Sequence, residues 1–157
     1  MPGTDGPLHE LPRLDEHAIT VAALPAATWQ AVLATLHDTF TSPRTAAVAR
    51  ALGCDPAATT RWDEPRAGST VPGFRVVAAE EPRLLVVAGR HRFSRYGIVV
   101  RLEPADDGTR VRLESRAGFP GPLGALYRLA VVGTGGHVVG VRRLLSAVRR
   151  AAEARPT

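Results

Sequence analysis

Residues 110–145 constrain the fold more than any other part of this chain. Over residues 110–119 apolar and charged side chains alternate, with Val111 and Leu113 in one phase and Arg112 and Glu114 in the other. This period of two predicts a strand with one buried face. After a break rich in proline and glycine, the pattern becomes helical and apolar but keeps polar groups on its stripe. A sheet followed by such a closing helix is the pattern expected of a ligand cavity.

The alternation predicts which strand residues are buried. On the last two strands one phase is apolar, while Arg101, Arg112 and Arg116 occupy the other. We expect the arginines to be exposed, because a one-residue shift of register would exchange the two faces. The residues that we expect to be buried are Ile98, Val100, Leu102, Val111, Leu113 and Ala117.

The composition excludes several kinds of chemistry. All twenty basic residues are arginine, so a Walker phosphate loop, a Schiff-base lysine and pyridoxal-phosphate chemistry are excluded. The single cysteine, Cys54, excludes disulfides within the chain and thiolate-rich zinc sites. The absence of lysine and asparagine, with abundant Ala, Val, Gly and Pro, is typical of a GC-rich genome, an actinobacterial-type composition.

The charge and the hydropathy pattern indicate the partners and the location. A net charge of +5 is common in nucleic-acid-binding proteins, but here the arginines are spread along the chain and aromatic residues make up only 5%. We therefore expect no nucleic-acid partner. Residues 126–141 are the most apolar run but are too interrupted to span a membrane. Without a signal-peptide pattern, we expect a cytoplasmic protein. The pattern carries no signal for an oligomeric state.

The order of elements predicts an α+β fold. We expect a flexible tail over residues 1–13 and one domain over residues 14–154. The first strand is expected at residues 17–23, followed by a helix from Pro25 and a second short helix from Pro43 to Gly53. Four strands are predicted at 74–79, 83–93, 96–103 and 109–119, with Trp62 on a further strand, and a closing helix at 123–154.

Three sequence segments resemble the START-like, or helix-grip, domains of the SRPBCC superfamily. They read "EHAITVAALPAATWQAVL", "RLLVVAGRHRFSRYGIVVRLEP" and "GTRVRLESRAGFPGPLGALYR". The resemblance covers residues 14–152. The superfamily includes polyketide cyclases and aromatases, plant allergen-type carriers and lipid-transfer domains. It implies a curved antiparallel sheet wrapped around a long C-terminal helix, two short helices after the first strand, and a ligand between sheet and helix.

The closing helix carries polar residues at three- and four-residue spacing. Tyr127, Thr134 and His137 share one face with Val131 and Val141. One interpretation is a helix packed on the sheet, with Tyr and His paired to backbone groups; we favour the other, in which these groups line a cavity. Glycines at positions 133, 135 and 136 favour a bend or a close approach to sheet or ligand.

The strands add further polar candidates. His91 and Tyr96 lie in inward phases and could act as general acids or bases, although a strand-end histidine such as His91 more often points to solvent. Ser115 is either a small space-keeper or a hydrogen-bond donor to a ligand. The residues that we expect to line the cavity are Phe93, Tyr96, Ile98, Val100, Leu113, Ser115, Phe119, Tyr127, Val131, Thr134, His137 and Val141.

The predicted function is binding of a small hydrophobic molecule of polyketide, lipid or aromatic type. The alternative is a cyclase, aromatase or dehydratase that uses the same cavity without metal or cofactor, with His137, Tyr127, His91 and Tyr96 as candidate catalytic residues. A third class is a protein-interaction module. Hydrolase elbows and metal-binding motifs are missing from the sequence, so we expect no metal.

Overall fold

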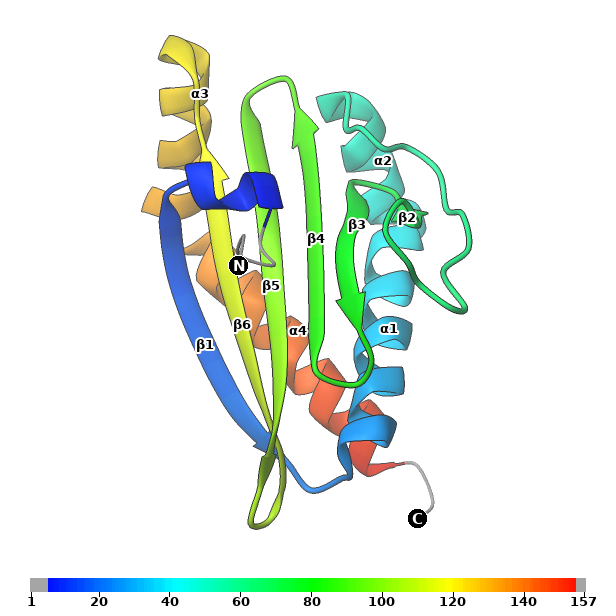
Figure 1. Cartoon of the computed structure of the whole chain (residues 1–157). Helices are drawn as coiled ribbons and strands as arrows, with labels where there is room; N and C mark the ends of the chain where they lie inside the picture. Colours follow the sequence, from blue (N-terminus) through cyan, green and yellow to red (C-terminus); the bar gives the residue numbers. More distant parts are fainter. Residues whose placement is uncertain (1–5, 155–157) are drawn as a thin grey trace.

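The computed structural model describes residues 6–154, and its central element is a six-stranded antiparallel sheet (Figure 1). The strand order is β1-β6-β5-β4-β3-β2, with consecutive strands from β2 to β6 joined as neighbours. The strands are β1 (Arg13–Val21), β2 (Thr70–Val71), β3 (Phe74–Glu80), β4 (Leu84–His91), β5 (Ser94–Ala105) and β6 (Gly108–Gly118). The predicted meander from residue 74 onward is therefore confirmed.

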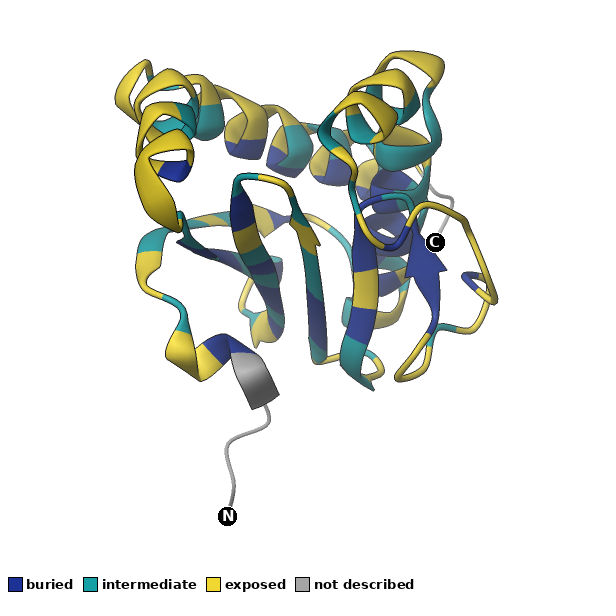
Figure 2. Ribbon diagram, turned by 90° about the horizontal axis from the view of Figure 1, so that it is seen from above, coloured by how far each residue is buried: buried dark blue, intermediate teal, exposed yellow. Residues whose placement is uncertain are grey.

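The helices cover one face of this sheet. They are α1 (Pro25–Thr41), α2 (Pro43–Leu52), α3 (Gly121–Arg128) and α4 (Gly136–Glu153), with a π-helical turn at Leu129–Gly133. Pro25 stands in the first turn of α1, and the hydroxyl of Ser42 accepts a hydrogen bond from the Thr45 amide at the start of α2. Gly53 ends α2 with a positive φ of 69°. In the view from above, the buried residues of α4 face the strands (Figure 2).

The predicted register is confirmed on its inward face. Val100, Leu102, Val111 and Leu113 are at most 3% exposed, Ala117 is also buried, and Ile98 packs against the same core. Trp29 and Leu36 of α1 cover them together with Val141, Leu145 and Val148 of α4. Through this core, α1 and α4 pack against the inward face of the sheet.

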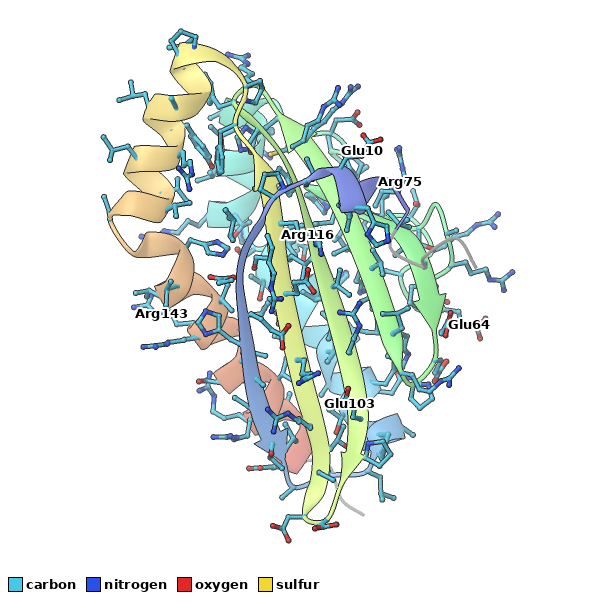
Figure 3. The ribbon with its side chains drawn as sticks, turned by 60° about the vertical axis from the view of Figure 1, so that its left-hand side comes forward. Glu10, Glu64, Arg75, Glu103, Arg116 and Arg143 are labelled. Atoms are coloured by element: carbon cyan, nitrogen blue, oxygen red, sulfur yellow. The ribbon has the colours of Figure 1, made fainter. Side chains whose placement is uncertain are left out.

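The arginines on the other face are less exposed than predicted. Arg101, Arg112 and Arg116 are half-buried, because they pair with glutamates on the outer face of the sheet. The Arg116 Nε donates to the Glu114 carboxylate at 2.6 Å, and the Glu114 side chain is only 8% exposed. Figure 3 shows Arg116 over the sheet, whereas Arg143 on α4 points away from it.

Part of the predicted N-terminal tail is ordered against the sheet. A short 3-10 helix, Gly6–Glu10, precedes β1, and Leu8 in it is 1% exposed. Leu8 packs on Val86 and Val99 from the outer face, and it contacts the position where Gly97 lacks a side chain. Residues 1–5 lie outside the described residues. The tail prediction therefore differs from the structure over residues 6–13, since the outer face also needs an apolar cover.

The closing helix is not continuous. It is interrupted between α3 and α4 by the π-helical turn and by Gly135, which has a positive φ of 78°. The glycine cluster predicted such a bend. Of the helices in residues 6–154, none is long and apolar enough to cross a membrane.

Residues 54–73 form irregular loops around β2. The prediction that Trp62 lies on a strand is wrong. Trp62 is nevertheless 7% exposed, and its indole Nε1 donates to the Leu33 carbonyl of α1 at 2.9 Å. Trp62 is therefore held by packing against α1 and not by pairing in the sheet.

Candidate functional site

A cavity of about 390 Å³ lies between the sheet and the helices. Strands β4, β5 and β6 form its floor, α1 and α2 form one wall, and α3, the π-helical turn and α4 form the other. Its size lies within the range of small-molecule sites in proteins. The strand register sets the floor, and the bend at Gly135 separates α3 from α4 in the second wall.

The wall contributed by α1 and α2 is mostly apolar, although Thr39 and Thr45 also border the cavity. Phe40 packs against Phe74 of β3 with ring centroids 4.5 Å apart, and Val48 and Leu52 of α2 complete this side. Phe74 in turn contacts the edge of Tyr96 at 5.2 Å. A ligand on this side meets mostly hydrocarbon, so burial of apolar surface would favour the contact.

Tyr127 anchors α3 to the sheet at the upper end of the cavity. Its ring lies 4.7 Å from His91, 5.7 Å from Phe93 and 6.2 Å from Phe119, measured between centroids. Gly124 of α3 allows this approach, because a Cβ there would lie 2.7 Å from the Phe119 backbone. Burial raises the pKa of the Tyr127 hydroxyl, with the nearby Cys54 thiol adding to the effect.

Tyr96 is held by a backbone partner. Its hydroxyl donates to the Gly73 carbonyl at 2.8 Å and lies 3.8 Å from the Cys54 Sγ. Burial, assisted by Cys54, raises its pKa far above the usual range. Gly89 makes room for this contact, since a side chain there would overlap the Gly73 carbonyl. Tyr96 is thus a neutral, hydrogen-bonded wall residue and a poor proton carrier.

His91 is also held at both ring nitrogens. Its Nδ1 accepts from the Phe93 amide at 3.1 Å, so the neutral ring carries its proton on Nε2, which lies 3.1 Å from the Ser94 hydroxyl. Burial lowers the pKa of His91 and favours this neutral form. Both nitrogens are used to close the turn between β4 and β5, which leaves the ring face for the cavity.

A group of three ionisable residues lies where β1 meets α4. The Nε2 of His137 is 3.2 Å from Asp15 Oδ2, and the Nε2 of His17 is 3.3 Å from the same oxygen. His137 lines the cavity. Ser115 also lines it, on β6 directly opposite Asp15 of β1. This side of the cavity is therefore polar, in contrast to the wall of α1 and α2.

Most of the predicted lining residues border the cavity. Those that do are Tyr96, Ile98, Leu113, Ser115, Phe119, Tyr127, Val131, His137 and Val141, and the candidate catalytic residue His91 borders it as well. Three others do not. Val100 lies deeper in the packed core, and Phe93 stacks on the Tyr127 ring from the turn. Thr134 is exposed and donates to the Ala130 carbonyl at 2.6 Å, because the bend at the glycines rotates it away from the sheet.

The sequence did not indicate several wall residues. Asp15 does not border the cavity itself but contacts His137 there; the sequence did not indicate it, because the first strand is expected to begin at residue 17 and the bulge between Arg13 and Asp15 sets its direction. Val48, Leu52 and Cys54 come from α2 and from the irregular segment that follows it. Their apolar spacing on α2 was the available signal. No local sequence pattern indicated that α2 packs over the sheet.

Within residues 6–154 no set of three or more His, Cys, Asp or Glu side chains is arranged to hold a metal ion. His17 and His137 are each directed at the Asp15 carboxylate instead.

No protein-family profile matches the sequence, and no curated protein matches it. Several solved structures are similar to this chain. A protein from Rhizobium leguminosarum is similar with 14% identity over 93% of this chain and 97% of that chain, at a TM-score of 0.55. A protein from Chromobacterium violaceum has 15% identity over 92% and 100%, at a TM-score of 0.54. Ara h 8.0201 has 11% identity over 90% and 97%, at a TM-score of 0.50.

These likenesses show the fold. The chain has the α+β helix-grip arrangement, a curved antiparallel sheet with two helices after the first strand and a long C-terminal helix. The fold predicted from the sequence is confirmed in this respect, with the closing helix divided at its bend.

Proposed function

We propose that this protein binds a small hydrophobic molecule in the cavity between the sheet and the C-terminal helices. The observation that carries the proposal is the cavity itself, about 390 Å³ in volume and walled by apolar side chains from α1, α2, β3 and β5. A few polar groups interrupt this lining. Concave, mostly apolar sites with a few placed polar groups are typical of small-molecule binding.

The sequence resemblance supports the same function. SRPBCC domains include carriers of hydrophobic ligands, and in them the ligand lies between the sheet and the C-terminal helix. The cavity here occupies that position. Fold alone does not define a ligand, so the proposal depends on the composition of the walls.

A titration with a fluorescent apolar probe, N-phenyl-1-naphthylamine, tests the proposal. We expect saturable binding of one probe per chain. Ala49→Phe should abolish it, because Ala49 lines the cavity and the added ring would fill the space. Ala47→Phe is the matched control, since Ala47 is exposed on the same helix. Unsaturable binding, or equal effects of the two variants, would contradict the proposal.

A second candidate is an enzyme of the cyclase or aromatase type. The observation that favours it is the contact of 3.2 Å between the His137 Nε2, at the cavity wall, and the Asp15 carboxylate. A carboxylate that orients an imidazole is a common arrangement for a general base. Of the four candidate catalytic residues, His137 alone has a carboxylate partner among the described residues; Tyr96 and His91 are committed to structural hydrogen bonds.

Hydrogen–deuterium exchange distinguishes the enzyme from the carrier. In D₂O, a general base in the wall would exchange the methyl protons of bound 1-acetylpyrene, and His137→Gln would abolish the exchange while keeping the ligand bound. Exchange no faster than in buffer identifies a carrier. The mass of the recovered ketone gives the result directly.

A further inference from the structure

One buried hydroxyl in the cavity wall has no partner. Ser115 is 3% exposed, and no group in residues 6–154 hydrogen-bonds to its Oγ. Buried polar groups are nearly always paired, because an unpaired one lowers stability. Two other buried side-chain atoms in the described part also lack hydrogen bonds, Trp29 Nε1 and Arg112 Nε, but they do not border the cavity. The Ser115 hydroxyl can therefore form a hydrogen bond with a ligand in the cavity.

The surroundings of Ser115 divide the cavity into a polar and an apolar side. On β1 its cross-strand partner is Asp15, whose carboxylate contacts His17 and His137. On β5 its partner is Ile98, which continues the apolar floor. A ligand with its hydrocarbon part toward α1 and α2 would thus place one polar atom near Ser115.

The charges near Ser115 disfavour an acidic ligand. Arg116 borders the cavity, but its Nε donates to Glu114 at 2.6 Å and its Nη1 to the Leu11 carbonyl at 3.3 Å. The closest carboxylate in the strand register is that of Asp15. A ligand carboxylate at Ser115 would lie close to the Asp15 carboxylate, and the neighbouring Arg116 guanidinium is already paired with Glu114 and the Leu11 carbonyl.

We propose that the ligand is a neutral molecule with one oxygen on a hydrocarbon skeleton, an alcohol or a ketone, and that the Ser115 hydroxyl binds this oxygen. The proposal rests on the proposed function and adds the chemical class of the ligand. A serine hydroxyl both donates and accepts, so it can pair with either group. The Ser115 hydroxyl, which has no partner within residues 6–154, is then paired in the complex.

Three fluorescent ligands of one skeleton test the proposal at pH 8: 1-ethylpyrene, 1-pyrenemethanol and 1-pyrenecarboxylate. The first two differ by a methyl group in place of a hydroxyl. We expect the alcohol to bind about three- to tenfold more tightly than the hydrocarbon, as one net hydrogen bond allows, and the carboxylate to bind most weakly. Equal affinities for alcohol and hydrocarbon, or a preference for the carboxylate, would overturn it.

Two variants separate binding from folding. Ser115→Ala should bind alcohol and hydrocarbon equally and keep or raise the melting temperature, because it removes an unpaired buried hydroxyl. Thr109→Val is the control on the same strand: Thr109 is fully buried and donates to the Ala23 carbonyl at 2.8 Å, away from the cavity. It should lower the melting temperature and keep the preference for the alcohol.

The outcomes distinguish this proposal from the proposed function. If none of the three pyrenes binds saturably to the wild-type protein, the proposed function fails. If they bind but Ser115→Ala keeps the preference, or loses stability as Thr109→Val does, the cavity binds ligands and the role of Ser115 is wrong.

Discussion

The Tyr96 hydroxyl and the Gly73 carbonyl are joined by a hydrogen bond of 2.8 Å, which ties β5 to the turn before β3 at the side of the cavity. The contact exists because Gly89, on the strand between them, has no side chain to block it. Tyr96 therefore contributes to the shape of the cavity and not to proton transfer.

Tyr96→Phe should lower the free energy of unfolding by about 1 kcal/mol at pH 7, the usual net value of such a bond. Because burial raises the pKa of Tyr96 in the folded protein, wild-type stability should fall as the pH rises above about 10, where the unfolded chain loses the proton first. The variant should lose less over this range. Urea unfolding at several pH values measures both effects; parallel curves above pH 10 would contradict them.

Cys54 provides a chemical probe of the cavity. Burial raises the pKa of this thiol, more than the hydrogen bond from Tyr96 lowers it, and the residue lines the wall. Alkylation by iodoacetamide at pH 8 should be slower than that of a free cysteine, because less thiolate is present. Bound N-phenyl-1-naphthylamine should slow it further.

The control for alkylation is a double variant, Cys54→Ser with Ala47→Cys. It places a single thiol on the exposed side of α2. Its reaction rate should not depend on the probe. A probe that protects both thiols equally, or neither, is not bound beside Cys54.

Strand periodicity was enough to predict the meander and its inward face, since β5 and β6 pair in one continuous register and their side chains alternate between the two faces of the sheet. The caps at Pro25, Ser42 and Gly53 likewise predicted α1 and α2 from local chemistry. The packing of distant segments was not predictable in this way. Leu8 over Gly97 and Trp62 against Leu33 join residues far apart in the sequence, and no local pattern encodes such pairs.

The candidate site shows the same division. Ile98, Leu113 and Ser115 follow from strand phase, whereas Asp15 depends on a bulge and Thr134 is turned away by a glycine bend. Both errors arise from irregular backbone, where a fixed period no longer gives the direction of a side chain.

Leu8 should contribute to stability although it precedes the first strand. Leu8→Ala removes a side chain that is 1% exposed and should cost about 2–5 kcal/mol in the free energy of unfolding. Leu24→Ala, at a leucine that is 74% exposed, should cost less than about 0.5 kcal/mol. Chemical denaturation compares them, and similar values for both would show that the N-terminal segment does not cover the sheet.

The ion pairs on the outer face predict a loss of stability in acid. Burial opposes ionisation of Glu114, but the hydrogen bond and charge of Arg116, with Arg13 and Arg101, lower its pKa below the usual value. At pH 7, Glu114→Gln should therefore destabilise the protein by about 1–3 kcal/mol. The difference from wild type should shrink as the pH falls below about 4, since the unfolded chain then binds the proton first and the folded carboxylate follows at lower pH. A difference that stays constant down to pH 2 would contradict the pairing.

The isoleucine methyl groups give the most direct measurement of ligand binding in the cavity. The chain has two isoleucines: Ile98 lines the cavity, and Ile19 packs against the core outside its lining. In a spectrum with labelled isoleucine δ1 methyl groups, titration with 1-pyrenemethanol should shift the Ile98 signal saturably and leave the Ile19 signal in place. Saturable binding that leaves the Ile98 signal unchanged would place the ligand elsewhere and contradict the account.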